Sequence, residues 1–268
     1  MSLSTFSLTR AQAARIRNLF RNKRARQADG AFVVEGAKFV RDLLLTHPTQ
    51  LQMLVVTAEY ERREHKHDRE IRASVDVPSY RCPDHTFAAI SDLEAPQGVL
   101  AVVRQPNWSE KELFNRPTIF GLYGEQLQDP ANVGAIIRTA AALNVSALWL
   151  TPESADVYNP KVVRATSGAL LSLPIFVAPD ATAITRKGCA IFSAEVGSRE
   201  TVQMETIRTV PQRVVLAVGN ESRGLSAQTT REASCRFTIP LERQVESLNV
   251  AATAAIALYY LGRLPKES

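Results

Sequence analysis

Polar residues able to bind a phosphate or a nucleotide gather in three short stretches in the second half of this 268-residue chain. The first stretch, NVGAIIRTA, begins at Asn132 and carries Arg138, and the second is GNESRG, residues 219–224. The third joins IPL, residues 239–241, to SLNVA, residues 247–251. An arginine in an otherwise apolar helix indicates an anion beside it, either a ligand phosphate or a structural carboxylate.

Each stretch follows a predicted strand or opens a predicted helix. These elements are apolar strands at 118–123, 214–218 and 236–239 and helices that begin at Asn132 and at 247–249. The carboxyl ends of parallel strands and the amino ends of helices are where α/β sheets bind ligands. Without a Cβ, Gly219 and Gly224 are expected to let backbone amides approach a ligand closely. The alternative is an ordinary strand–turn–helix connection, and neither a G-x-G-x-x-G nor a P-loop sequence is present.

Strands and helices alternate along the whole chain, which predicts an α/β protein. We expect a small α/β domain at residues 1–105, a linker at 106–117 and a second domain at 118–268. The first domain is expected to hold strands at 31–34, 51–57, 78–81 and 98–104, helices at 9–20, 59–72 and 83–90, and a basic loop or frayed helix end at 21–30. The second is expected to add strands at 147–150 and 189–193 and a short helix at 160–169.

The positive charge is concentrated near the amino terminus. Residues 1–40 hold eight Lys or Arg and two acidic residues, a net charge of +6, whereas the whole chain carries +5. Such a face is typical of proteins that bind a phosphate backbone, although a merely solvated helix has the same composition. The candidate contacts to such a phosphate backbone are Arg21, Lys23, Arg24 and Arg26.

Composition argues against several other classes. No apolar run reaches the roughly 18 residues of a membrane helix, and the first residues lack the apolar core of a secretory signal. The three cysteines are odd in number and widely spaced, so we predict neither a disulfide framework nor a zinc ribbon. His65 and His67 diverge on a predicted helix, which favours a solvated face over a metal site. We therefore expect a cytoplasmic protein without a metal.

The three stretches, written as NVGAIIRTA, VGNESRGL and IPL…ESLNVAATAAIAL, resemble the three motifs of the SpoU (TrmH) family of RNA ribose 2′-O-methyltransferases, in the SPOUT superfamily. VRATSGALLSLP, SAEVG, FVVEG and APQGVLAVV are similar to other parts of that family. The resemblance implies a homodimer that binds S-adenosylmethionine in a mostly parallel C-terminal sheet with a deep trefoil knot. It also implies that an L30e-like first domain binds the substrate, which would be ribosomal RNA or transfer RNA.

The same resemblance implies roles for individual residues. We expect cofactor contacts from Gly219, Ile239 and Leu248, mostly through backbone groups. Arg138 matches the catalytic arginine, and because a guanidinium stays protonated, we expect it to hold the target phosphate and stabilise the developing oxyanion. The other matched residues are Asn132, Ser247 and Asn249, which would orient ribose and phosphate, and Glu221, which would fix the loops, contact a partner subunit or form a structural salt bridge.

One position departs from the family pattern, because Arg223 stands where small residues are frequent. Two alternatives to an RNA methyltransferase stay open. A catalytically silent RNA-binding member of the family would keep the basic face, but the presence of Arg138, Glu221, Ser247 and Asn249 argues against it. An unrelated dinucleotide-binding enzyme is disfavoured because the sequence lacks the glycine fingerprint.

Overall fold

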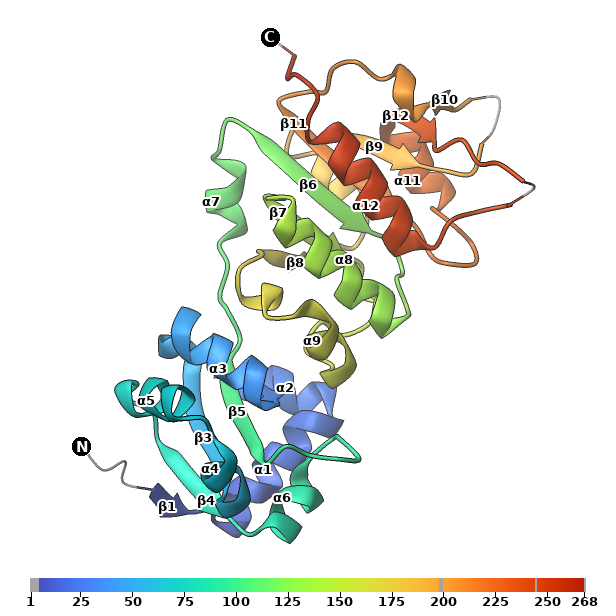
Figure 1. Ribbon diagram of the computed structural model, residues 1–268. Helices are drawn as coiled ribbons and strands as arrows, with labels where there is room; N and C mark the ends of the chain where they lie inside the picture. Colours follow the sequence, from blue (N-terminus) through green and yellow to red (C-terminus); the bar gives the residue numbers. More distant parts are fainter. Residues whose placement is uncertain (1–4, 198–199, 244, 268) are drawn as a thin grey trace. The chain divides into compact units, whose positions relative to one another are not determined.

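The computed structural model describes residues 5–197, 200–243 and 245–267, which form two compact units. The first unit runs to Asn107 and also takes Tyr158–Leu171, whereas the second comprises Trp108–Val157 and the chain from Ser172 onward. Each unit is a sheet with helices packed on it (Figure 1). The division differs from the expected domains, because residues 158–171 were expected in the second domain and lie in the first unit.

The first unit is built on a five-stranded sheet in the order β1-β4-β3-β5-β2. Its strands are β1 (Thr5–Ser7), β2 (Ala31–Glu35), β3 (Leu51–Thr57), β4 (Ser79–Cys82) and β5 (Val99–Arg104). β4 is parallel to β1 and β3, whereas β5 is antiparallel to β2 and β3. The four longer strands lie where the apolar runs predict them, and the short β1 has no such signal.

Helices pack against this sheet to enclose the core of the first unit. They are α1 (Arg10–Arg21), α2 (Lys23–Asp29), α3 (Ala37–Thr46), α4 (Ala58–Arg63), α5 (Lys66–Ser74), α6 (Asp84–Ile90) and α9 (Pro160–Thr166). α1 is capped by Thr9, whose Oγ1 accepts from Gln12 N over 3.2 Å and whose N donates to the Gln12 side chain over 2.9 Å. The helix buries Ile16 and Leu19 in the core.

Two predictions for this unit are wrong. Residues 23–29, expected as a loop or frayed helix end, form α2, because the Asn22 side chain accepts from the amides of Arg24 and Ala25 and caps a new helix. The single helix expected at 59–72 is the pair α4 and α5. The break between them lets Arg72 pair with the buried Glu64 carboxylate over 2.9 Å.

The second unit is built on a seven-stranded sheet in the order β10-β12-β9-β11-β6-β7-β8. Its strands are β6 (Ile119–Gly124), β7 (Ala147–Leu150), β8 (Ile175–Val177), β9 (Ala190–Ala194), β10 (Val202–Gln203), β11 (Arg213–Val218) and β12 (Ala233–Thr238). Every neighbouring pair is parallel. The predicted α/β fold with a mostly parallel sheet is therefore confirmed. Of the strands that the structure describes in this unit, the short edge strands β8 and β10 are not among the expected ones.

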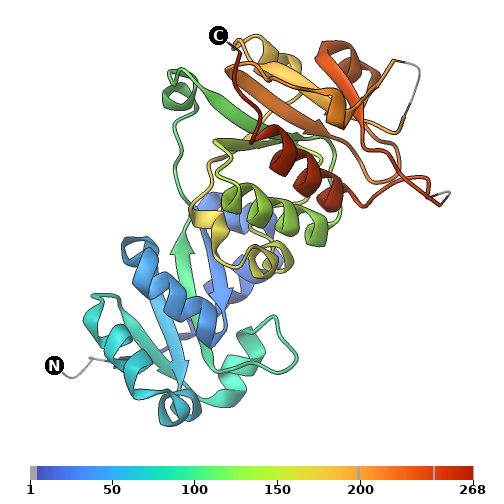
Figure 2. The same cartoon turned by 45° about the horizontal axis from the view of Figure 1, so that its top comes forward.

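Helices cover both faces of this sheet, as an all-parallel sheet requires. They are α7 (Glu110–Phe114), α8 (Pro130–Ala142), α10 (Thr182–Thr185), α11 (Ala227–Glu232) and α12 (Val250–Leu261). α8 and α12 lie side by side on one face (Figures 1 and 2). Leu113 of α7 and Ile184 of α10 pack with Tyr123 and Trp149 in the core of the other face.

Two local predictions for the second unit need correction. The expected linker contains α7, which is fixed to the sheet because Trp149 Nε1 donates to the Glu110 carboxylate over 2.7 Å. The cap of α8 is Asp129 rather than Asn132, since Pro130 takes the first helical position and Asp129 accepts from Ala131 N over 2.8 Å. Asn132 consequently lies inside the first turn of α8.

α9 belongs to the first unit because its side chains pack there. The Tyr158 ring lies 5.0 Å from the Phe32 ring, and Arg164 pairs with Asp92 over 2.9 Å. Pro160 lies with β2 residues around a small hollow of the same unit.

Three further features of the described residues concern membrane-spanning helices, metal-binding groups and cysteines. None of their helices has the length and apolarity needed to cross a bilayer. No three His, Cys, Asp or Glu among them gather into a group able to hold a metal ion. Cys82, Cys189 and Cys235 are free thiols.

Candidate active site

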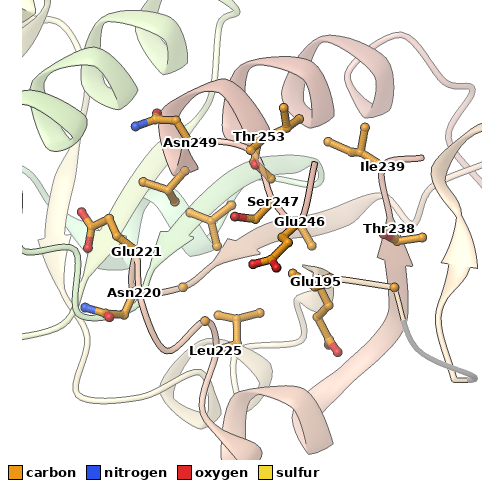
Figure 3. A pocket seen from close by; sticks show the side chains of 18 of the residues that line it. Glu195, Asn220, Glu221, Leu225, Thr238, Ile239, Glu246, Ser247, Asn249 and Thr253 are labelled. Atoms are coloured by element: carbon orange, nitrogen blue, oxygen red, sulfur yellow. The ribbon is translucent and has the colours of Figure 1, made fainter. Parts of the chain in front are cut away.

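A cavity of about 800 Å³ opens in the second unit where three parallel strands end. Residues 194–197 follow β9, 218–225 follow β11 and 238–241 follow β12, while 245–250 lead into α12. Figure 3 shows the loop with Asn220 and Glu221 facing the strand end with Thr238 and Ile239 across this cavity. The sequence-based expectation that separate strand–loop junctions of this half meet at one site agrees with this geometry.

The loop after β11 is held in shape by Asn220. Its side-chain amide donates to Gln126 O over 2.8 Å, and its carbonyl oxygen accepts from the amides of Ser222 and Arg223 over 3.0 and 3.1 Å. Its backbone exchanges two hydrogen bonds with Gly224. These bonds turn the chain back on itself, so that residues on both sides of the turn face the cavity.

The turn itself requires both glycines of this loop, whether or not a ligand approaches them. A Cβ on Gly219 would lie 2.2 Å from Gly224 C and 2.3 Å from Leu225 N, so the loop's own backbone excludes it. Gly224 has φ +68°, in the left-handed region that favours glycine, and a Cβ there would meet nothing within 4 Å. Gly219 also lines the cavity, and the turn can form only because this residue has no side chain.

Hydrogen bonds connect residues of all three sequence motifs. Asn132 Nδ2 donates to Glu221 Oε1 over 3.0 Å, and Asn249 Nδ2 donates to Asn132 Oδ1 over 2.9 Å. The Asn249 carbonyl oxygen in turn accepts from the amides of Ala251 and Ala252, which caps α12. The result is a continuous polar bridge from the β11 loop through α8 to α12.

The environment of Glu221 favours its charged form. Partial burial alone raises the pKa of this carboxyl, but hydrogen bonds from the Asn132 amide and from the backbone of Glu221, Asp129 and Gln128 outweigh it and lower the pKa. Glu221 is therefore an acceptor that fixes loops rather than a proton donor.

The structure places most of the predicted site residues at this cavity. Gly219, Ile239 and Leu248, the expected cofactor contacts, all line it, as do Glu221, Ser247 and Asn249. Asn132 is buried behind the lining and joins Glu221 to Asn249.

Arg138 lies elsewhere than expected. It does not line the cavity, and its side chain is exposed on the outer side of α8. The expectation of an arginine within an apolar face is wrong, because the buried residues of α8 lie on the opposite side of the helix.

Two glutamates at the cavity were not singled out from the sequence. Glu195 follows β9, forms an ion pair with Arg236 over 2.8 Å and accepts a hydrogen bond from Ser193 Oγ over 2.6 Å. Glu246 precedes Ser247 and points into the cavity (Figure 3). The signal for Glu195 was present in the sequence, because SAEVG ends a predicted strand as the known motif residues do.

The predicted RNA contacts separate into two groups. Arg21, Lys23 and Arg24 are exposed on α1 and α2. Arg26 is only 4% exposed, and its guanidinium donates to Leu19 O over 2.7 Å and Phe20 O over 3.1 Å. The prediction that Arg26 contacts RNA is therefore wrong, because its guanidinium donates to carbonyl groups at the end of α1.

A parallel sheet covered by helices, with an open cavity of polar and apolar residues at the carboxyl ends of its strands, is the architecture of an α/β enzyme that binds a nucleotide-like ligand. The chain belongs to the SpoU rRNA Methylase family, whose model matches residues 120–259. A second model, the MRM3-like substrate binding domain, matches residues 14–101. The family predicted from the three motifs is thereby confirmed, and with it the class of RNA methyltransferases.

Similar proteins cover almost the whole chain. A 23S rRNA (guanosine(2553)-2′-O)-methyltransferase of Bacillus subtilis is 27% identical over 89% of this chain and 91% of its own. A 23S rRNA (uridine(2479)-2′-O)-methyltransferase of Streptomyces viridochromogenes is 31% identical over 90% and 84%. The crystal structure of the SpoU methyltransferase AviRb from Streptomyces viridochromogenes with AdoMet superposes with a TM-score of 0.82, at 26% identity over 95% and 98%.

Proposed function

We propose that this chain transfers a methyl group from S-adenosylmethionine to a ribose 2′-hydroxyl of ribosomal RNA. The observation that carries the proposal is the meeting of Gly219, Ile239 and Leu248 at one cavity that a polar bridge ties to Asn132. Similar proteins named as 23S rRNA 2′-O-methyltransferases support the substrate class, and a similar structure with AdoMet supports the cofactor. A catalytically silent member is disfavoured because the motif side chains are intact, and Asn132, Glu221 and Asn249 form one network.

The lining of the cavity fits this cofactor. Its volume falls within the roughly 300–1,000 Å³ of small-molecule sites. Val196 and Val245 line it although they are 68% and 52% exposed, and Ile239 and Leu248 add further apolar surface. Such a surface suits an adenosine ring, and the backbone of Gly219, which lines the cavity, would recognise a polar edge of that ring.

The reaction moves a methyl group to a hydroxyl oxygen, so the enzyme must position the ribose and stabilise the alkoxide that develops. The bound cofactor supplies an electrophilic methyl group. Ser247 and Asn249, at the start of α12, would orient the ribose and the neighbouring phosphate. Arg138 would hold that phosphate and stabilise the oxyanion, with the hydroxyl proton leaving to the phosphate or to water.

We further propose that the protein acts as a homodimer through the exposed face of α8 and α12. Ile256 and Tyr259 of α12 are 41% and 53% exposed there. Arg138 is exposed on α8, beside α12, and does not line the cavity of its own chain. In a dimer formed through this face, Arg138 would act at the cavity of the partner subunit. Association of two copies would bury the apolar side chains of this face.

Other parts of the proposal rest on the family likeness. They are a deep trefoil knot around the cavity, an L30e-like fold of the first unit, a cytoplasmic location and activity without a metal. The free cysteines fit a reducing compartment. Transfer RNA stays the second candidate substrate.

The test combines cofactor binding with methyl transfer. The purified full chain should bind S-adenosylmethionine in a calorimeter and should transfer a tritiated methyl group to ribosomal RNA that lacks its native modifications. Mapping of 2′-O-methylated positions should then identify a ribose. Label on a base, or no binding of the cofactor, would refute the proposal.

A further inference from the structure

Glu246 is the uncompensated carboxylate of the cavity. Glu195 is paired with Arg236, and Glu221 accepts from Asn132. Among the described residues, none makes a hydrogen bond or ion pair with the Glu246 side chain, although Figure 3 shows its carboxylate in the central part of the cavity beside Ser247. A carboxylate inside a ligand site favours a cationic group as its partner.

Arg223 supplies the opposite charge. Of the lining residues that the structure describes, it is the only Lys or Arg. Its backbone is fixed, because Arg223 N donates to Asn220 Oδ1 over 3.1 Å in the turn after β11. The cavity lining thus includes one free carboxylate and one arginine, from two different loops, a combination that matches a zwitterion.

We propose that Glu246 and Arg223 recognise the amino-acid end of the methyl donor, a role that rests on the proposed function. Glu246 accepts hydrogen bonds from the α-ammonium group, which has three N–H donors, and Arg223 donates to the α-carboxylate. The apolar residues of the same cavity are left for the adenosine end. The two loops therefore sense whether the ligand carries its amino-acid part.

The test compares ligands with and without that part. Calorimetry would measure S-adenosylhomocysteine and 5′-methylthioadenosine, which lacks the amino-acid end, on the full-length wild type and on E246Q and R223A. Each substitution should weaken S-adenosylhomocysteine about tenfold or more and leave 5′-methylthioadenosine unchanged. E242Q and R231A are matched controls on residues outside the cavity, and both should bind as the wild type does.

Three results would overturn the inference. Equal weakening of both ligands would mean that the substitutions disturb the cavity in general. Unchanged affinity for both would mean that neither side chain touches the donor. If E246Q binds S-adenosylmethionine more weakly but binds S-adenosylhomocysteine with unchanged affinity, the Glu246 carboxylate contacts the sulfonium group instead of the ammonium group. A wild type that binds no S-adenosylmethionine would refute the proposed function itself, so the two failures are distinct.

Discussion

Asn249 Nδ2 donates to Asn132 Oδ1 over 2.9 Å and so joins the amino ends of α12 and α8, 117 positions apart in the chain. Asn132 passes the connection to Glu221 through its own amide. The buried side chain of Asn132 therefore fixes the relative positions of the β11 loop and the amino ends of α8 and α12.

Replacing Asn132 by Ala should reduce methyl transfer far more than cofactor affinity, because Asn132 lies behind the cavity rather than in it. The change also removes one hydrogen bond from Glu221 and one from Asn249, which should lower the free energy of unfolding by about 1–3 kcal/mol. Tritium transfer, calorimetry and urea denaturation measure the three effects. Asn107→Ala, at an exposed position, is the control. Equal loss of transfer and binding would show that the bridge shapes the cofactor site itself.

The stability contributed by Glu221 should depend on pH. Its pKa is lowered in the folded protein, so its contribution is fully present above the ordinary value of 4.5 and is lost as the pH falls through the lower folded value. Wild type should therefore be more stable than E221Q at neutral pH, and the difference should shrink in the acid range below about pH 4.5. Urea denaturation at several pH values measures this. A gap that stays constant down to the lowest pH would contradict the assignment.

Substitution of Arg138 by Ala should lower methyl transfer by about 10²–10³-fold, the usual effect of removing a group that stabilises a developing oxyanion. Cofactor affinity should stay nearly unchanged, since the side chain does not line the cavity. Single-turnover transfer and calorimetry separate the two quantities, with Arg231→Ala as the control. A parallel loss of both would make the arginine structural.

Neutralising Arg21, Lys23 and Arg24 to Gln should weaken RNA binding and reduce its dependence on salt by about two to three units of the log–log slope. Filter binding between low and moderate salt measures the slope. The triple change of Arg62, Arg63 and Lys66, exposed at 74–92% on α4 and α5, is the control. Arg26→Ala belongs to another class: it should destabilise the first unit, because the carbonyls of Leu19 and Phe20 lose their donor. RNA affinity that does not respond to the first triple change would remove this face from the interface.

Gly219→Ala should be much more harmful than Gly224→Ala. The first adds a Cβ 2.2 Å from backbone of the same turn, where nothing can yield. The second substitution adds a Cβ in open space, so its cost is only that of holding an alanine in the left-handed conformation, about 1–2 kcal/mol. Thermal unfolding and cofactor calorimetry on both variants give the comparison. Similar losses would mean that the turn relaxes around the added methyl group.

Sequence reasoning located this site because its signals are local. A strand that ends in GNESRG and a helix that begins after SLN are legible without tertiary contacts, and the parallel sheet brings the strand ends to one edge. Charge was a poorer guide. Nothing in the composition of residues 21–26 distinguishes Arg26, which the fold uses for its own carbonyls, from Arg24, which it leaves in water.

Tertiary packing decided what the sequence left open. Residues 158–171 read as part of the second domain because the chain there is continuous with it, yet Tyr158 and Arg164 find their partners in the first unit. The sequence does not reveal the second reason for Gly219, because Gly224 comes close to it only once the turn has formed.

Because α9 packs with the amino-terminal unit, the polypeptide passes between the two units three times, after residues 107, 157 and 171. A hybrid protein in which residues 1–107 are replaced by the first unit of a relative would keep α9 of this chain. The side chains of α9 would then lack the partners on which they pack here. Exchange of the first unit between relatives therefore requires residues 158–171 to be exchanged together with residues 1–107.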